Sequence, residues 1–411
     1  MSVDTAPPTP PIWSVDDRSE PAGPLAELGH PLRVLMVMHL PALLELGGAR
    51  VQLELAEVLR ENGCQVRVLD RAEILGGRRK GRLGVSPDAF AAAARRRVRD
   101  LASDFDIIDA HQGSLPVAKH RLGFSGLMVT RSVGLAPFYA DFERHARERW
   151  PALKKGYLVT RPLHRRRNRR FLEQVEASFR LSDLIIVPNR DELLYMRDHL
   201  GAQEKTVVRP LGISESQLSR LHPLVNDRAG AGPRVAFIGA WCARKGSEDW
   251  REIAARVRRS LPEASFTFLG THSSRAAVAA AVGLEGDALE VVPSYPTEQL
   301  GGLLAGVRVG ALPSYIEGLG IGVVEKMAAG IPSVCYDVPG PRETIGRVDS
   351  DLLVPAGDTA AFAERIVELL RLDDRAYRKL SERCRWMAEQ FSWRLIGRET
   401  LSSYRRQMAL L

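Results

Sequence analysis

The chain has 411 residues, 45% of them hydrophobic and 26% charged, with a formal net charge of +8. At this length we expect two domains, each with its own hydrophobic core. Its four cysteines are scattered singly, which excludes a disulfide framework and a CxxC metal pair and favours a reducing compartment. No apolar run is long enough to span a bilayer, and the amino terminus lacks the hydrophobic segment of a signal peptide. The sequence therefore predicts a soluble, cytoplasmic protein.

The first elements in chain order are a tail and a βαβ unit. Residues 1–30 carry six of the 25 prolines and almost no periodic pattern, which predicts a flexible tail. Residues 33–40 form a continuous apolar run, typical of a strand buried on both faces. A short loop ending in Gly47 and Gly48 leads into apolar residues at helical spacing, and residues 65–70 supply the next strand.

Strand and helix patterns continue to alternate along the chain. Further strands are predicted at 105–111, 126–132, 182–189, 234–240, 265–270, 289–293, 309–314 and 332–337. This alternation predicts an α/β protein with parallel sheets and helices on both faces. The patterning is weakest at 213–233, so we expect two Rossmann-like, doubly wound domains, over residues 31–215 and 216–390.

Positive charge is concentrated in residues 141–170, which hold eleven Arg or Lys and three Asp or Glu. Their net +8 equals the charge of the whole chain. One interpretation is a solvated helix face. The other is an anionic partner, and the apolar residues interleaved with the cations favour an anionic membrane surface. No nucleic-acid-binding motif accompanies the segment, so we expect no nucleic-acid partner.

The stretch "YIEGLGIGVVEKMAAG" (315–330) has the most informative pattern. It places a loop after a predicted strand and before a helix, where ligands bind in doubly wound folds. The alternate glycines let the backbone approach a ligand, and free N–H groups at the helix start favour an anion such as a pyrophosphate. Glu317 would lie near the polar group that such a ligand carries on its diphosphate. Glu325 could accept hydrogen bonds from the two hydroxyls of a ribose.

These residues resemble the retaining glycosyltransferases of family 4, which have the GT-B fold of two Rossmann-like domains facing across a cleft. "EGLGIGVVE" resembles the E-x7-E element of that family. The resemblance extends over about residues 33–405, and the segments that carry it are "AAGIPSVCYDVPGPRE" (328–343), "FIGAWCARKG" (237–246), "DAHQG" (109–113) and "FSW" (391–393). It implies a C-terminal helix at 391–411 that crosses back to the first domain.

The resemblance also implies site roles in the second domain. Glu325 would bind the ribose hydroxyls of a nucleotide sugar, such as a UDP- or GDP-sugar. Glu317 and the amides of Gly318, Leu319 and Gly320 would hold the sugar and the pyrophosphate. Lys245 would pair with the phosphates and stabilise the leaving nucleoside diphosphate. No metal or other cofactor is expected, and the chain has no Asp-x-Asp motif.

Further roles follow from the same resemblance. Backbone near Val292 and Pro293 would face the base, while His111 and the loop of Gly47 and Gly48 would close the cleft from the first domain. His111, Glu317 and Lys245 are the expected catalytic residues. The expected acceptor is a hydroxyl on a glycan, as in polysaccharide synthesis, or on a lipid-linked molecule. The basic segment 141–170 favours the lipid-linked acceptor and predicts an enzyme that is peripheral at the inner face of the cell membrane.

One departure from the family keeps an alternative open. An Arg often follows the glycine of the phosphate element, but here Ala240 follows Gly239, and Arg244 is the residue that could supply the charge to the donor site. A catalytically inactive nucleotide-binding or regulatory protein with the same fold is the alternative. Lys245 and His111 also have structural interpretations, as a helix-start residue and a hydrogen-bonded core histidine. A nicotinamide-dependent oxidoreductase is disfavoured, because no GxGxxG follows the first strand.

Overall fold

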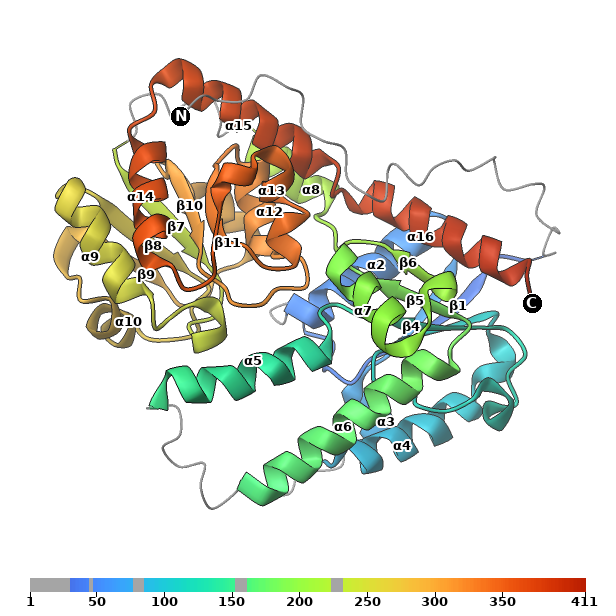
Figure 1. Cartoon of the computed structure of the whole chain (residues 1–411). Coiled ribbons are helices and arrows are strands. Elements are labelled where there is room, and N and C mark those ends of the chain that lie inside the picture. The colour runs from blue at the N-terminus through green and yellow to red at the C-terminus, as the bar shows by residue number, and fades with distance from the viewer. Residues whose placement is uncertain (1–29, 44–46, 77–84, 152–160, 223–231) are drawn as a thin grey trace. The chain divides into compact units, whose positions relative to one another are not determined.

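The structure is a computed structural model that describes residues 30–43, 47–76, 85–151, 161–222 and 232–411. It divides into two compact units (Figure 1). The N-unit comprises the described residues between 30 and 211 together with Trp393–Leu411, and the C-unit comprises Gly212–Ser392, again as far as described. The expected tail, apart from its last residue, lies outside the described residues, as do residues 152–160 of the basic segment.

The N-unit is built on a six-stranded parallel sheet of order β2-β1-β3-β4-β5-β6. Its strands are β1 (Arg33–Val37), β2 (Gln65–Leu69), β3 (Ile107–His111), β4 (Leu127–Arg131), β5 (Leu184–Val187) and β6 (Thr206–Val208). Every residue of β3, β4 and β5 is buried, as expected of strands covered on both faces. Burial on both faces therefore explains the apolar residues that begin β3 and β4 and fill β5.

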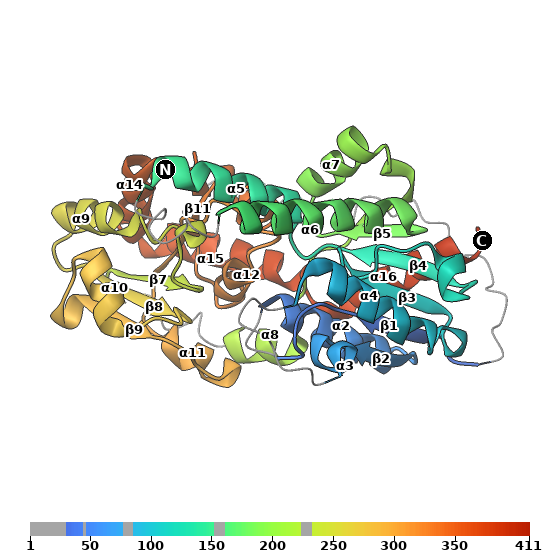
Figure 2. The same cartoon turned by 90° about the horizontal axis from the view of Figure 1, so that it is seen from below.

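Helices cover both faces of this sheet (Figure 1). The helices of the unit are α2 (Gly47–Glu61), α3 (Arg71–Leu75), α4 (Pro87–Arg99), α5 (Ala136–Arg149), α6 (Arg161–Leu181), α7 (Arg190–Leu200) and α16 (Trp393–Met408), of which α5 projects away from the sheet. Helix α6 packs against α4 and α5 (Figure 2). The C-terminal helix α16 packs against α2, where Gly397 approaches Val58 too closely to leave room for a side chain.

The C-unit has a second six-stranded parallel sheet, of order β12-β11-β10-β7-β8-β9. Its strands are β7 (Arg234–Ile238), β8 (Ser265–Leu269), β9 (Leu289–Val292), β10 (Val309–Leu312), β11 (Ser333–Tyr336) and β12 (Leu353–Val354). Its helices are α8 (Glu215–Leu221), α9 (Trp250–Ser260), α10 (Arg275–Val282), α11 (Leu300–Leu303), α12 (Ile321–Ala328), α13 (Ile345–Val348), α14 (Thr359–Leu370) and α15 (Asp374–Glu389). Trp250 is fully buried and packs edge-on against Phe237, Phe266 and Phe268, which fixes α9 on the sheet.

The predicted α/β class is confirmed, and every predicted strand is present with slightly shorter bounds. Two strands were not predicted, β6 and β12, which form one edge of each sheet and have three and two residues. The interpretation of Gly47 and Gly48 as the end of a loop was wrong. They are the first two residues of α2, because the packing of the apolar face of this 15-residue helix outweighs the low helix propensity of glycine in its first turn.

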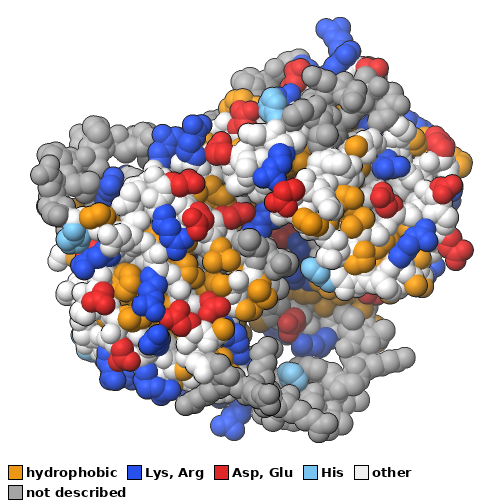
Figure 3. All heavy atoms as spheres, turned by 180° about the vertical axis from the view of Figure 1, so that it is seen from behind, with side chains coloured by type: hydrophobic (Ala, Val, Ile, Leu, Met, Phe, Trp, Pro, Cys, Tyr) orange, Lys and Arg blue, Asp and Glu red, His pale blue; other side chains and the backbone are white. Residues whose placement is uncertain are grey.

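The surface carries both signs of charge. In the view of Figure 3, basic and acidic side chains lie interspersed over much of the described surface. Among the described residues, no helix has both the length and the hydropathy needed to cross a bilayer. The basic side chains of α6 are mostly exposed in its amino-terminal half.

Candidate functional site

The loop after β7 lies against the loop after β10. A single turn of 3-10 helix, Ala243–Lys245, ends at Gly246, whose φ is +79°. A side chain at Gly246 would collide with the carbonyl oxygen of Pro313, only 2.2 Å from the Cβ position. The backbone N–H of Tyr315 also donates to the carbonyl of Arg244 at 2.9 Å. Only glycine allows the backbone at 246 to lie this close to Pro313. The close contact between the two loops places Lys245 beside the loop that carries Glu317.

Lys245 and Glu317 form a close ion pair. The Nζ of Lys245 donates to Oε1 of Glu317 at 2.5 Å, and the two side chains are 16% and 6% exposed. Burial opposes the charged carboxylate, but the charges of Lys245 and Arg244 outweigh burial, so the pKa of Glu317 is lowered. Glu317 is therefore a carboxylate at neutral pH, and Arg244 is close enough to act on the same site.

Helix α12 starts directly after this loop. Gly320 is its N-cap, with φ +84°, and no side chain caps the helix. The amides at the helix start thus have no side-chain partner of the usual Ser, Thr, Asp or Asn kind. The neighbouring Leu319 is buried, and Gly340 of the following loop approaches its backbone so closely that a Cβ would lie 2.6 Å away. This packing holds the glycine loop in one place, with a helix start that favours an anion.

Glu325 lies about one turn into α12 and is 4% exposed. The side-chain amide of Gln217 donates to its Oε1 at 3.2 Å. Gln217 also closes a capping box with Ser214 at the start of α8, so its position is fixed by the helix that it caps. The sequence did not indicate this partner of Glu325, although the capping pattern "SESQ" (214–217) was present.

Val292 and Pro293 stand where β9 ends. Their carbonyl oxygens accept hydrogen bonds from the backbone N–H groups of Gly270 and His272, both at 2.9 Å. His272 has φ +50°, and among the described residues no other non-glycine residue adopts a positive φ. A contact to a base would therefore use a second carbonyl lone pair or the backbone next to these residues.

The remaining predicted site residues, His111, Gly47 and Gly48, belong to the N-unit, whereas Lys245, Glu317 and Glu325 belong together in the C-unit. His111 ends β3, is 5% exposed, and has its Nδ1 2.9 Å from Nδ1 of His39. Its Nε2 is buried and has no hydrogen-bond partner. The pKa of His111 is lowered, chiefly by burial and also by His39 and Arg131. A neutral imidazole with one unsatisfied nitrogen is chemically suited to a ligand oxygen.

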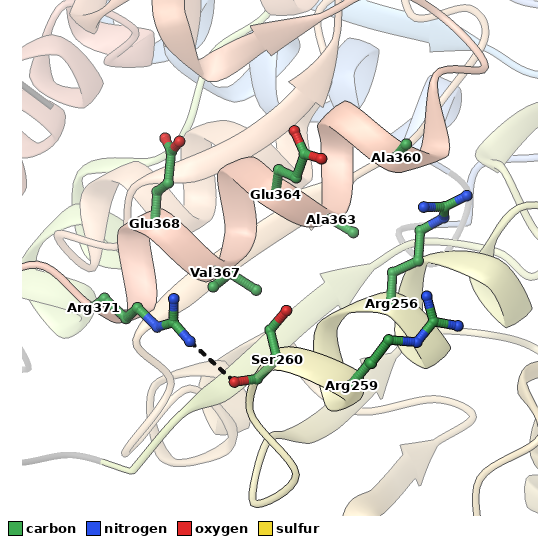
Figure 4. Close-up of a pocket in the computed structure, with 9 residues that line it drawn as sticks. All are labelled: Arg256, Arg259, Ser260, Ala360, Ala363, Glu364, Val367, Glu368 and Arg371. Atoms are coloured by element: carbon green, nitrogen blue, oxygen red, sulfur yellow. Dashed lines mark hydrogen bonds between the residues drawn. The ribbon is translucent and has the colours of Figure 1, made fainter.

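Metal ligands and surface hollows elsewhere in the described residues were also considered as candidate sites. No group of three or more His, Cys, Asp or Glu suited to a metal ion occurs within the described ranges. A surface hollow of about 410 Å³ lies between α9 and α14, and Figure 4 shows arginines and carboxylates around it. There Arg371 donates to the carbonyl of Ser260 at 3.1 Å. None of the predicted site residues lines this hollow.

Comparison with known proteins gives three similar relatives. A 2-deoxystreptamine glucosyltransferase of Streptomyces kanamyceticus is 30% identical over 43% of this chain, and the match spans 46% of that relative's length. An alpha-maltose-1-phosphate synthase of Mycolicibacterium smegmatis is 27% identical over 88% of this chain and 96% of its own length. A phosphatidyl-myo-inositol mannosyltransferase of Mycobacterium leprae is 27% identical, with 78% of this chain and 83% of the relative covered.

Solved structures and a family model agree with these relatives. Sucrose-phosphate synthase from Thermosynechococcus elongatus has a TM-score of 0.68 at 18% identity, covering 92% of this chain and 100% of the other. Anabaena HepE, in complex with UDP and glucose, has a TM-score of 0.62 at 16% identity, covering 90% and 100%. Residues 232–372 match the model of "Glycosyl transferases group 1". With the E-x7-E element on a strand–loop–helix and a parallel sheet in each unit, the chain has the GT-B fold, and its residues 232–372 match the group 1 glycosyltransferases.

Proposed function

We propose that this protein is a retaining glycosyltransferase that moves a sugar from a nucleotide sugar, such as a UDP- or GDP-sugar, to an acceptor hydroxyl. The observation that carries the proposal is the Lys245–Glu317 pair beside the uncapped start of α12, with buried Glu325 on the same helix. A cation, the amides at a helix start and a hydroxyl-binding carboxylate are the three groups that a sugar nucleotide requires. Support also comes from the similar fold of Anabaena HepE, solved with UDP and glucose.

Each residue has a defined task in this proposal. The amides of Gly318, Leu319 and Gly320 bind the pyrophosphate, and Glu325 binds the ribose with its geometry set by Gln217. Lys245 stabilises the negative charge that grows on the leaving diphosphate. Before the donor arrives, the hydrogen bond to Glu317 holds the side chain of Lys245 in place.

Further donor contacts come from other segments. Arg244 adds a second positive charge to the phosphate site, and backbone next to Val292 and Pro293 meets the base. From the N-unit, the helix start at Gly47 and Gly48 and the unsatisfied Nε2 of His111 serve the sugar and the reaction centre. We assign the donor to residues 216–390 and the acceptor to residues 31–215.

We further propose a glycan or lipid-linked acceptor and a cytoplasmic enzyme that binds peripherally to the inner face of the cell membrane. The name of the Mycobacterium leprae relative specifies a phosphatidylinositol lipid. In this chain, Arg165 and Arg166 of α6 are exposed, and Arg169 is 80% exposed. Such a row of cations suits an anionic membrane surface.

The donor proposal can be tested by thermal stabilisation with UDP, GDP and ADP and their glucose and mannose derivatives. A ligand present at 100 times its Kd stabilises the folded state by about 2.7 kcal/mol. One diphosphate should stabilise the parent protein, and the effect should be lost in Glu325→Gln and in Lys245→Gln. Both changes keep a hydrogen-bonding side chain in a buried place. Glu364→Gln and Lys379→Met, on α14 and α15, are the controls and should respond like the parent.

The outcomes separate the two candidate functions. Stabilisation followed by sugar transfer to an acceptor supports the glycosyltransferase. Stabilisation with neither transfer nor hydrolysis, across lipid-linked and glycan acceptors, supports the inactive nucleotide-binding protein, which Ala240 in the phosphate element favours. If no diphosphate or sugar nucleotide stabilises the parent, both proposals fail.

A further inference from the structure

A lysine is fully buried in the C-unit beneath the proposed donor site. Lys326 follows Glu325 on α12 and has 0% exposure. Its Nζ donates to the carbonyl of Ala311 in β10 at 3.2 Å, the one hydrogen bond that its three N–H groups make with described residues. Lysine is almost never fully buried unless it is paired with an opposite charge. A single carbonyl acceptor is poor compensation for an ammonium, so packing alone does not explain this residue.

The sheet makes room for this side chain. A Cβ at Gly310 of β10 would lie 2.8 Å from Cδ and 2.9 Å from Cε of Lys326, and 2.1 Å from Oγ of Ser333. Glycine at this place in β10 therefore accommodates the lysine stem between α12 and the strand pair β10–β11. The space is built for a long side chain, and an apolar one of the same length would fit it equally well.

The charges around Lys326 are those of the donor site. Burial, and to a smaller degree Lys245, lower the pKa of Lys326, whereas Cys335, Glu325 and Glu317 raise it, and together these effects bring the pKa to about 8. Cys335 lies on β11, and burial raises its own pKa to about 12. Lys326 is thus coupled to Lys245, Glu317 and Glu325, and with a pKa of about 8 it loses its charge just above neutral pH.

We propose that Lys326 is a hidden cation of the donor site: when a nucleoside diphosphate binds, one proton passes from solvent to Nζ of Lys326, and the ammonium formed stabilises the bound diphosphate. This inference rests on the proposed function, because it takes the diphosphate to bind at Lys245, Glu317 and the start of α12. No bond to the ligand is made or broken. Lys326 acts electrostatically and does not touch the substrate, so it is a positioning residue.

The experiment is calorimetric titration of the parent with the nucleoside diphosphate that stabilises it, at pH 8.5, in buffers of different ionisation enthalpy. At this pH the diphosphate is fully ionised, and histidines and carboxylates do not titrate. The parent should take up about half a proton per ligand bound, since a group with a pKa near 8 is mostly neutral at pH 8.5. Its affinity should fall about sixfold between pH 7.5 and 9.5, the effect over this range of a pKa that rises by about one unit on binding.

Lys326→Met is the test variant, because methionine is apolar and has a similar length. It should bind the diphosphate about tenfold more weakly than the parent at pH 7.5, without proton uptake and with no pH dependence. Its Tm should equal or exceed that of the parent, since an apolar side chain replaces a buried amine. Lys379→Met, on α15 of the same unit, is the control and should behave like the parent in all three measurements.

Three results are distinguishable. If the parent binds no nucleoside diphosphate, the proposed function fails, and this inference fails with it. If the parent binds the diphosphate without proton uptake, or Lys326→Met retains the uptake, only the role of Lys326 is overturned. A lower Tm in Lys326→Met with unchanged affinity would instead assign the lysine a purely structural role through Ala311.

Discussion

At the residue scale, the imidazoles of His39 and His111 in the N-unit are joined by a single hydrogen bond. The Nδ1 atoms of His39 and His111 lie 2.9 Å apart, so one of them donates and the other accepts. Nδ1 of His39 also lies 3.2 Å from Oγ of Ser114. A single N–H can be shared between two acceptors, whereas one ring lone pair cannot accept two donors well. His39 is therefore the donor, and the proton of neutral His111 lies on Nε2, the buried atom that has no partner.

This pair predicts a pH dependence of stability. Burial, and then Arg71, lower the pKa of His39 to about 4. The unfolded chain therefore binds the proton first, so stability falls as the pH drops through 6.5 and levels off below about 4. From His39 alone, the free energy of unfolding should decrease by about 2 kcal/mol between pH 7 and pH 5.

Urea unfolding of the parent and of His39→Asn, at both pH values, measures this contribution. Asparagine does not titrate, and its amide can still donate to His111. The variant should lose about 2 kcal/mol less than the parent on acidification. The remaining loss in the variant belongs to His111 and the other groups of the unit. Equal losses in the two proteins would contradict the assignment.

Single residues also mark the limit of sequence-based inference. Arg131 ends β4, a position typical of acceptor contacts in this fold. In the structure it is 3% exposed, and its Nη2 donates to Asp109 at 2.7 Å and to the Tyr404 hydroxyl at 3.1 Å. Tyr404 is 273 positions away in the chain, and no local pattern reveals such a partner. The E-x7-E loop was predictable, because its strand, glycines and helix are consecutive.

At the scale of elements, periodicity predicted the long strands and failed for the short edges. Strands β1 to β5 and β7 to β11 have four or five residues each with dense apolar patterns, and each was predicted. Strands β6 and β12 have three and two residues, too few for a pattern of period two to differ from a loop. Their place is determined by pairing with β5 and β11, which is a tertiary interaction.

Helix α6 is the element that tests the membrane proposal. Its carboxyl-terminal half is anchored by buried Val175 and Phe179. Arg170 in its middle pairs with Asp88 of α4 at 2.9 Å. Toward the amino-terminal end, Arg165 and Arg166 are exposed and make no ion pair with any described residue. One half of the helix is therefore fixed to the unit, and the other half exposes its cations to solvent.

We expect the triple change Arg165→Ser, Arg166→Ser and Arg169→Ser to weaken binding to phosphatidylserine-containing vesicles. Each cation near an anionic surface contributes about 1 kcal/mol, so the loss should be about 100-fold at low salt. The difference should shrink as ionic strength rises. Sedimentation with vesicles measures it, while donor binding should not change.

The matched control removes the same charge from a different helix. Arg95, Arg96 and Arg99 are exposed on α4 of the same unit, and their change to serine should leave most of the vesicle binding intact. If both triple variants bind equally weakly, the effect is one of net charge, and α6 is not a specific membrane surface. If the parent does not sediment with the vesicles, the peripheral location is wrong.

At the scale of the whole molecule, the chain leaves the N-unit at residue 211 and returns to it at Trp393. Three contacts fix the returning helix. The indole N–H of Trp393 donates to Glu54 of α2 at 2.7 Å, Gly397 approaches Val58, and the Tyr404 hydroxyl donates to Asp109 within β3. The N-unit therefore cannot complete its core until the C-unit has been synthesised, and the last helix is part of its stability.

We therefore expect matched Tyr→Phe changes in the two units to lower two different unfolding transitions. Tyr404→Phe removes a buried donor from the Asp109–Arg131 pair, which should cost about 1–3 kcal/mol. Tyr377→Phe removes the hydrogen bond that the Tyr377 hydroxyl donates to the carbonyl of Arg308 at 2.7 Å in the C-unit. For a unit of this size, 1 kcal/mol corresponds to a shift of about 2–4 °C in Tm.

Calorimetry should show that Tyr404→Phe lowers one unfolding transition and Tyr377→Phe lowers the other. The nucleoside diphosphate should raise only the transition that Tyr377→Phe lowers. A single transition that responds to both changes and to the ligand would mean that the chain unfolds as one cooperative body, and that the donor site and the returning helix depend on each other for stability.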